Sequence, residues 1–351
     1  MSYITIGPIK FCFYGKVDFL SDVIDHYDIL NKDSEYTKII QIQVNDSRLS
    51  SSYIANNGIT IYPEKFSKQA SVLYNHCKNA DAFAGLAYID CNERDRHIFF
   101  KRSDLDYLIY VNSSPQFAYH SIVRLCRDIA ASELEKNGGL LLHSAAVVNK
   151  ENKVTLIFGD SGAGKTTTAV NYVMSGYRFL SNDKCLIDSN LNVYHFPYTN
   201  RIGTGTYRHV AKNINESPTK RRITSELLKF SKNCDRWGSR EKLTLSNMDY
   251  VDLFSTKLVS KGKVERIVLP SLNNTTNPIY QETCRIPKDL FNRNILKPNN
   301  GLANRDYFKG FSQNEDLSIA TSNIYHLLNN LKTSRLLGGA MNLPKNYYEY
   351  N

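Results

Sequence analysis

The chain has 351 residues, with 44 lysines and arginines against 34 aspartates and glutamates, so its formal net charge is +10. Hydrophobic residues make up 42% of the chain and charged residues 22%, which is enough to form a buried core and excludes an intrinsically disordered chain. A chain of this length is typical of two domains, or of one large domain with an appendage.

The sequence contains no recognisable membrane or export signal. No apolar run approaches the ~20 residues that a membrane-spanning helix needs, and the opening residues lack the basic and apolar regions of a signal peptide. We therefore expect a cytoplasmic protein with no membrane partner. Seven scattered cysteines without a C-x-x-C pair argue against a disulfide framework and against a structural zinc site.

Residues 1–115 are predicted to form a β-rich α+β domain that serves docking or assembly. Runs of β-branched and aromatic residues, parted by Gly, Asn, Asp and Ser clusters, are typical of strands. Such runs are YITIGPIKFCFYG, TKIIQIQV, GITIYP, FAGLAYI and HIFFKRSDLDYLIYV. Residues 21–30 and 66–77 are predicted to be short helices between the strands. We find no catalytic motif in this half.

Residues 116–351 are predicted to form a second domain of the α/β class. Apolar residues recur at helical spacing from Ile122 to Leu134, and Gly138-Gly139 follows as a helix end. Two continuous apolar runs come next, residues 140–148 and residues 154–158. Each run is predicted to be one buried strand, because central strands that are covered on both faces lack polar alternation.

A complete phosphate-binding loop follows the second apolar run. Residues 159–166 read GDSGAGKT, which fits G-x-x-x-x-G-K-[ST], and they open into the helix-compatible stretch TTTAVNYVMSG. In such loops backbone N–H groups and the helix N-terminus bind phosphate, the lysine neutralises the outer phosphates, and the last hydroxyl ligates Mg2+. We therefore predict that the loop binds ATP, with GTP left open as the donor, and that Thr166 binds Mg2+. The predicted binding residues are Gly159, Asp160, Ser161, Gly162, Ala163, Gly164, Lys165, Thr166 and Thr167.

A second motif of phosphate-loop enzymes is an apolar strand that ends in a magnesium-binding aspartate. The best candidate is YRFLSND, which places Asp183 eighteen residues after Lys165. This spacing is shorter than is usual in GTPases and motor ATPases. Asn182, directly before Asp183, is a second candidate metal ligand, with a plain turn cap as the alternative.

Residues 138–188 resemble the core of HPr kinase/phosphorylase and its relatives, which include the HPr-kinase-related enzymes of peptide natural-product biosynthesis. The segments GGLLLHSAAVV and LIFGDSGAGKTTTAVNYVMSGYRFLSNDKCLID carry the similarity. The shared features are a histidine on the strand before the loop, the loop itself, and an acidic pair after the helix. Fainter similarity continues through residues 195–205, 242–245 and 264–273. The resemblance implies an HPr-kinase/PEP-carboxykinase-like core.

The resemblance also implies an activity and the residues that perform it. The protein is expected to be a Mg2+-dependent kinase that transfers the γ-phosphoryl group of ATP to a hydroxyl of a peptide, a protein or a small natural-product alcohol. Asp183 would bind the metal and activate the acceptor, Lys165 and His143 would lie beside the phosphates, and Arg201 would hold the transferring group. Relatives commonly form rings or dimers, so a homo-oligomer is also expected.

The chain departs from the family at Asn182, which stands where the first member of the acidic pair is expected. An amide oxygen can ligate Mg2+, but the amide does not accept a proton at neutral pH. Asp183 alone would then act on the acceptor. This departure supports a second hypothesis, a nucleotide-binding regulatory switch with weak NTPase activity.

The positive charge is concentrated in a basic segment, residues 201–242. This segment has eleven lysines and arginines against four acids, so it carries seven of the ten excess charges. We interpret it as an insertion that covers the nucleotide phosphates or holds an acidic acceptor, with a solvated loop as the alternative. A nucleic-acid-associated ATPase is a third hypothesis. The absence of a helix-turn-helix, a zinc module and aromatic–basic interleaving argues against it, so no nucleic-acid partner is expected.

Overall fold

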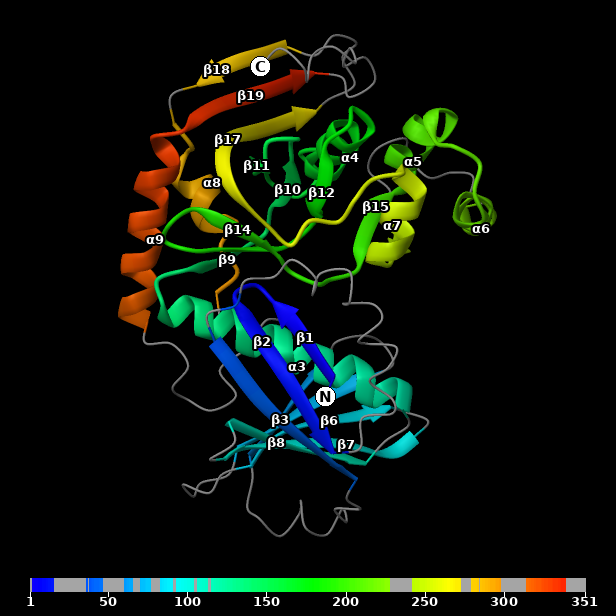
Figure 1. Ribbon diagram of the computed structural model, residues 1–351, viewed down its shortest axis with the longest axis vertical. Helices are drawn as coiled ribbons and strands as arrows, with labels where there is room; N and C mark the ends of the chain where they lie inside the picture. The colour runs from blue at the N-terminus through cyan, green and yellow to red at the C-terminus, as the bar shows by residue number, and fades with distance from the viewer. Residues whose placement is uncertain are drawn as a thin grey trace. The chain divides into compact units, whose positions relative to one another are not determined.

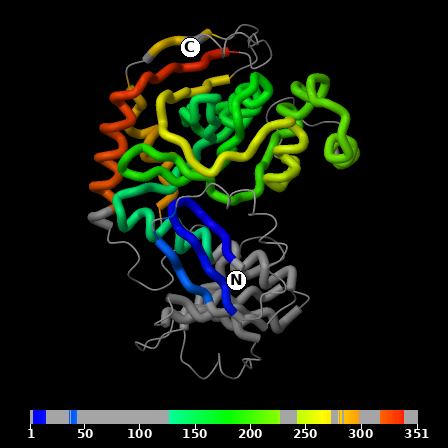
Figure 2. Tube along the Cα trace, viewed as in Figure 1, coloured from blue at the N-terminus to red at the C-terminus, as the bar shows by residue number. Residues whose placement is uncertain are grey.

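The computed structural model describes most of the chain and divides it into two compact units. The described residues are 2–15, 36, 38–46, 60–65, 70–76, 83–90, 93–103, 106–112, 115–227, 242–272, 279–283, 285–297 and 314–338 (Figures 1 and 2). One unit comprises Met1–Lys136 with Lys297–Leu317, and the other comprises Asn137–Leu296 with Ser318–Asn351. Helix α3, Pro115–Lys136, therefore belongs to the first unit, whereas the sequence-based boundary at residue 115 placed it in the second.

The first unit contains an eight-stranded sheet in the order β1-β2-β3-β8-β7-β6-β5-β4. Strand β3 is parallel to both of its neighbours, and the other strand pairs are antiparallel. The β-rich prediction is confirmed. The strands are β1 Ser2–Ile6, β2 Ile9–Gly15, β3 Lys38–Asp46, β4 Thr60–Lys65, β5 Ala70–His76, β6 Phe83–Asp90, β7 Glu93–Ser103 and β8 Asp106–Asn112.

One of the two predicted helices in this unit is wrong. Residues 66–77 contain strand β5, which pairs along its whole length with β4 on one side and β6 on the other. Pairing on both edges supplies hydrogen bonds to the backbone and overrides the local helical spacing of apolar residues. The predicted helix at residues 21–30 lies outside the described residues.

The second unit is built on a mixed nine-stranded sheet, so the chain is of the mixed α/β class. Strands β11, β17 and β19 are parallel to one another, and the remaining pairs are antiparallel. The strands are β9 Leu140–Leu142, β10 Ala145–Val148, β11 Lys153–Ile157, β12 Arg178–Ser181, β13 Cys185–Ile187, β14 Asn192–His195, β17 Lys261–Leu272, β18 Ile279–Thr283 and β19 Lys332–Gly338.

The single strand predicted over residues 140–148 is in fact two strands, β9 and β10. Strand β9 pairs with β13 and β10 pairs with β12, so the break at residues 143–144 lies opposite the break at residues 182–184. At the break, the backbone of His143 pairs with the segment that follows α8. The His143 N–H donates to the Asn294 carbonyl at 2.7 Å. The continuous apolar pattern does not reveal this interruption, because both strands are equally buried.

The helices of the second unit cover the nine-stranded sheet and extend from it. In Figure 1, α5, α6 and α7 gather on one side of this unit, and α8 and α9 lie on the other. No helix among the described residues is long and apolar enough to cross a membrane. The helices are α4 Lys165–Met174, α5 Thr204–Val210, α6 Pro218–Leu227, α7 Asn247–Phe254, α8 Lys288–Arg293 and α9 Asn314–Asn329. Strands β15 Asn200–Gly203 and β16 Lys242–Leu245 form a separate two-stranded antiparallel sheet, with α5 and α6 between them in the chain, and α5 and α7 directly follow β15 and β16.

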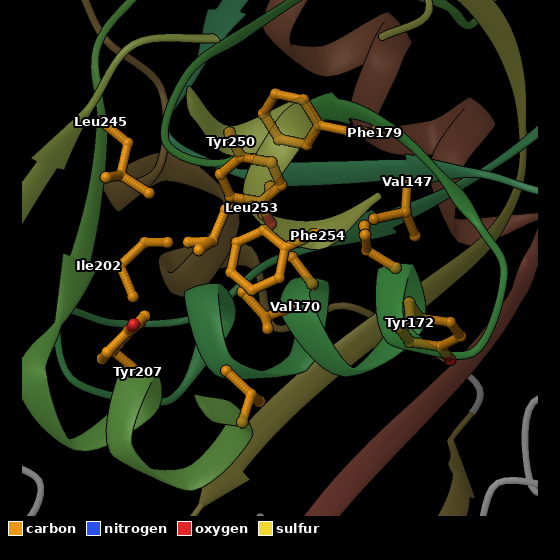
Figure 3. Close-up of a cluster of buried hydrophobic side chains, with 14 of the residues drawn as sticks. Val147, Val170, Tyr172, Phe179, Ile202, Tyr207, Leu245, Tyr250, Leu253 and Phe254 are labelled. Carbon is orange, nitrogen blue, oxygen red and sulfur yellow. The ribbon is translucent and has the colours of Figure 1, made fainter. Parts of the chain in front are cut away.

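One hydrophobic core joins α4 to the start of the basic segment (Figure 3). Val170 and Tyr172 of α4 are buried in the same cluster as Ile202 of β15 and Tyr207 of α5. Tyr250 of α7 stacks on Phe179 of β12 with ring centroids 4.1 Å apart. This packing fixes β15, α5 and α7 relative to the helix that begins at the phosphate loop.

The Tyr250 hydroxyl offers a test of this core. It is buried and has no hydrogen-bond partner among the described atoms, and burial raises the pKa of this phenol. A buried polar group without a partner costs about 1–3 kcal/mol, so Tyr250→Phe should leave the free energy of unfolding unchanged or raise it. Tyr250→Ala should lower it by about 3–5 kcal/mol, as other large aromatic truncations do. Urea denaturation measures both, and a clear loss of stability in Tyr250→Phe would contradict the packing described.

Candidate functional site

The phosphate loop connects the end of β11 to the start of α4, which confirms the predicted strand, loop and helix. Gly162 and Gly164 have φ angles of +82° and +104°, in the left-handed region that favours glycine. A Cβ atom on Gly164 would collide with the side chain of Leu272, so a side chain at this position requires Leu272 to move. The Leu272 N–H donates to the Ala163 carbonyl at 3.1 Å, which ties the loop to the end of β17.

Lys165 is buried inside this loop, with 7% of its surface exposed. Its Nζ donates to the carbonyls of Gly159 at 2.7 Å and Asp160 at 3.3 Å. Burial lowers the pKa of Lys165, the carboxylates of Asp183 and Asp160 partly offset this, and Lys242 adds to the lowering. The ammonium group is therefore held by neutral carbonyls in a loop shaped to accept an anion.

The two threonines after Lys165 have different surroundings. Thr166 is half-buried, and its hydroxyl makes no hydrogen bond within the described part of the chain, so it can ligate a metal ion. The Thr167 hydroxyl lies 2.8 Å from the Thr206 hydroxyl in α5. The predicted binding residue Thr167 thus uses its side chain to link the loop helix to the basic segment.

His143 and Asp183 meet across the paired strand breaks. Nε2 of His143 lies 3.1 Å from Oδ1 of Asp183, and both side chains are about one-third exposed. Burial alone would raise the pKa of Asp183. The hydrogen bond and charge of His143, together with the charges of Lys184 and Lys165, outweigh it and hold this pKa below its usual value. Asp183 is therefore ionised at neutral pH and is a weaker base than an isolated aspartate.

Asn182 is buried beside Asp183, with 3% of its surface exposed. Its Nδ2 donates to the Arg201 carbonyl at 3.3 Å, but its Oδ1 has no hydrogen-bond partner among the described atoms. An acceptor buried without a partner costs free energy until a cation or a donor satisfies it. The structure thus brings Arg201 to the site through its backbone, and its side chain is exposed.

The oxygen atoms at this site fit a magnesium ion. Mg2+ prefers hard oxygen ligands and keeps several waters, so one or two carboxylates with a hydroxyl or amide oxygen are sufficient. Asp183, the unsatisfied Oδ1 of Asn182 and the Thr166 hydroxyl are of this type. Among the described residues, no group of three histidines, cysteines or acidic residues is placed to hold a metal ion. Any metal bound here would therefore depend on mixed oxygen ligands and on the phosphates.

A buried hydrogen-bond network that the sequence did not reveal holds residues 182–183 in place. Nδ1 of His195 is hydrogen-bonded to the Leu180 carbonyl, which can only accept, so Nδ1 carries the proton. Nε2 then accepts from Nδ2 of Asn247 at 3.0 Å, and Oδ1 of Asn247 accepts from Nδ2 of Asn200 at 2.8 Å. This chain of bonds ties β12, just before Asn182, to β14, β15 and α7.

Arg293 is a second residue that sequence reasoning missed. From the end of α8 it makes a bidentate ion pair with Asp160 in the loop, with Nε to Oδ1 at 3.0 Å and Nη2 to Oδ2 at 3.2 Å. Both side chains are more than half exposed. No local pattern marks Arg293, because it lies 133 residues from Asp160 along the chain. The pair places a guanidinium at the outer side of the phosphate loop.

The described part of the basic segment uses several of its charges within the protein. Lys220 pairs with Glu216 at 2.6 Å, and Arg222 pairs with Glu226 of its own helix at 3.0 Å and with Asp249 of α7. Lys242 is exposed, but its charge reaches Lys165. The interpretation that the segment covers the phosphates stays a prediction, and residues 228–241 lie outside the described residues.

Comparison with known proteins adds no family to this description. A scan against protein-family models and a search of curated proteins both found no match for the chain.

Two glycines of the loop form a matched pair for testing its packing. Gly162→Ala and Gly164→Ala both place a side chain at positive φ, but only position 164 also collides with Leu272. Overpacking costs about 1–3 kcal/mol, so Gly164→Ala should be destabilised by that much more than Gly162→Ala. In the double variant Gly164→Ala/Leu272→Ala, the smaller side chain at position 272 should relieve part of the extra destabilisation. Thermal denaturation of the wild type, the three single variants and this double variant checks the prediction. Equal losses of stability in Gly162→Ala and Gly164→Ala would contradict the contact.

Proposed function

We propose that the protein is a Mg2+-dependent kinase that transfers the γ-phosphoryl group of ATP to a hydroxyl of a peptide, a protein or a small molecule. The observation that carries this proposal is the shared electrostatic environment of Lys165 and Asp183, since each charge shifts the pKa of the other. A phosphate-binding lysine and an ionised aspartate that is hydrogen-bonded to a histidine are the groups that phosphoryl transfer to a hydroxyl requires.

Each group has a role that follows from its surroundings. The N–H groups of the loop and the Lys165 ammonium bind the outer phosphates and stabilise the charge of the transferring group. Asp183, Asn182 and Thr166 would hold Mg2+, which neutralises phosphate charge when bound. The acceptor oxygen forms a bond to the γ-phosphorus, the bond to the bridging oxygen of ADP breaks, and the hydroxyl proton passes to Asp183. Because Asp183 is a weak base, its main contribution is to orient the hydroxyl, and His143 fixes the carboxylate for that task.

The family assignment is part of the proposal. The resemblance of residues 138–188 to HPr kinase/phosphorylase supports an HPr-kinase/PEP-carboxykinase-like core, and the parallel pair β11–β17 beside the loop is compatible with it. His143 lies in the break between β9 and β10, where it contacts Asp183, which supports a functional role over a core role. A regulatory nucleotide-binding switch is the second candidate. The amide of Asn182, which replaces one carboxylate of the expected pair, favours it.

Substitution of the two central residues tests the kinase. Lys165→Ala should abolish nucleotide binding and transfer, because the loop loses the only positive side chain among residues 159–166. Asp183→Asn should weaken MgATP binding only in part, since the loop and Lys165 remain, and should lose about 10²-fold or more in transfer rate because the acceptor hydroxyl is no longer oriented. Lys153→Ala and Asp252→Asn, both at exposed positions, serve as controls.

The assay measures radiolabel transfer from γ-labelled ATP to candidate serine peptides, with MgATP affinity from calorimetry. Transfer that survives both Lys165→Ala and Asp183→Asn would refute the kinase. Tight MgATP binding that depends on Lys165, without transfer to any acceptor, would instead identify the switch.

The Arg293–Asp160 pair predicts opposite effects of two substitutions. Because Asp160 competes with the phosphates for the guanidinium, Arg293→Gln should weaken MgATP binding and Asp160→Asn should strengthen it. Exposed charge pairs contribute about 0.2–1 kcal/mol, so each change should be about 1.4- to fivefold in Kd. Lys288→Gln, an exposed cation on the same helix, is the control. If Asp160→Asn weakens binding as much as Arg293→Gln does, the pair supports the loop and does not compete with the ligand.

A further inference from the structure

A cavity lies at the end of α4 that is remote from the phosphate loop. It has a volume of about 720 Å³, within the size range of small-molecule sites, and residues of the β10–β11 turn, β11, β17 and β19 contribute to its lining. Helix α4 begins at Lys165 in the loop and ends at Met174, and Gly176 and Tyr177 directly after it line this cavity. The cavity and the loop are therefore separated by the length of the helix.

The floor of the cavity is a polar row across three parallel strands. Thr155 of β11 is paired in register with Arg266 of β17, and Arg266 is paired with Lys332 of β19, so the three side chains share one face of the sheet. On the same face, the next row toward the loop contains Ile157 and Val268, which are buried beneath α4. The face thus changes from apolar to polar where the ten-residue helix ends and no longer covers it.

An irregularity in β17 turns Arg266 toward the cavity. Val154 is opposite Val264, but Thr155 is opposite Arg266, so Glu265 is an extra residue in this strand. Without this β-bulge, Glu265 would oppose Thr155 and the sign of the charge on the floor would be reversed. Bulges of this kind commonly re-aim a side chain next to a functional site.

The groups on the floor are mainly hydrogen-bond donors. Arg266 is half-buried, and its guanidinium makes no hydrogen bond or ion pair within the described part of the chain. Burial raises the pKa of Tyr177, Arg266 partly offsets this and Glu265 adds to it, so the phenol stays protonated and can donate. Thr155 is 5% exposed and adds a hydroxyl. The Arg266 guanidinium lines the cavity and is available to an anion.

The exposed rim limits the charge of that anion. Lys150, Glu151 and Glu265 line the cavity and are exposed, while Lys332 is partly neutralised by Glu282 at 3.4 Å. Because the charges on the rim nearly balance, Arg266 supplies the main excess of positive charge, which fits a singly charged ligand better than a multiply charged one such as phosphate. A single carboxylate matches the planar fork of Arg266, because a guanidinium binds it through two parallel hydrogen bonds. The Tyr177 ring, which meets Tyr172 edge-on at 4.9 Å, provides an apolar wall.

We propose that this cavity binds a small organic monocarboxylate whose carboxylate is held by Arg266, Thr155 and Tyr177. The site is distinct from the phosphate loop and does not depend on the proposed kinase activity.

Titration of the isotopically labelled full-length protein with benzoate, followed by NMR, tests the proposal. Benzoate should shift the backbone signals of residues 155, 177 and 266, in the wild type and in Lys165→Ala alike. Arg266→Gln should weaken binding about tenfold or more, the effect of losing a hydrogen-bonded charge. Arg335 is an exposed arginine on β19, and its odd spacing from Lys332 places it on the opposite face of the sheet. The Arg335→Gln variant should therefore bind benzoate as the wild type does.

Two further ligands and a second variant test whether the carboxylate group is what the cavity recognises. Benzylamine, of similar shape and opposite charge, should not bind at these residues, and inorganic phosphate should bind there more weakly than benzoate. Thr155→Val keeps the shape of the floor and should weaken benzoate binding severalfold, which gives a second readout if Arg266→Gln does not fold. Unchanged affinity in Arg266→Gln or Thr155→Val, signal shifts confined to residues 159–166, or equal binding of benzylamine would overturn the proposal.

Discussion

The hydrogen bond between His143 and Asp183 exists because two paired strands break at the same level of the sheet. If residues 140–148 and 178–187 formed two unbroken strands, neighbouring side chains would alternate between the faces and backbone pairing would continue through the site. The break releases residues 143–144 and 182–184 from the ladder, and the segment at Asn294 satisfies the backbone of His143. The buried hydrogen-bond network through His195 then fixes the end of β12, so Asn182 and Asp183 have a defined position beside the phosphate loop.

This arrangement leaves an electrostatic imbalance that an anionic ligand with its metal would remove. Lys165 is buried among carbonyl groups, with its pKa lowered by burial, and Oδ1 of Asn182 is buried without a partner in the described chain. A bound phosphate would favour the charged form of Lys165, and a cation would satisfy Asn182. The hydrophobic core beneath the loop joins α4 to α5 and α7. The free energy gained by this packing offsets the cost of keeping these polar groups unsatisfied.

The sequence predicted the features that depend on local pattern. The glycines and lysine of residues 159–166, the strand before them and the helix after them could all be identified, because the loop requires those residue types at fixed spacing. The length of the strand at residues 140–148 could not be predicted, because an apolar run looks the same on both sides of a break. Pairing on both edges made a strand of residues 70–76, within the stretch predicted as a helix. Arg293, Asn247 and Arg266 act through partners distant in the sequence or through a bulge, and such contacts leave no local pattern.

The proposed function requires that the phosphate loop and the His143–Asp183 pair form one site. The most direct measurement is NMR of histidine-labelled protein titrated with MgATP, with the His143 imidazole signals assigned from the His143→Gln variant. If the two parts form one site, MgATP will shift the ring nitrogen and carbon signals of His143, and the shift will be absent in Lys165→Ala. His143 signals that stay unchanged while MgATP saturates the loop would contradict the single site.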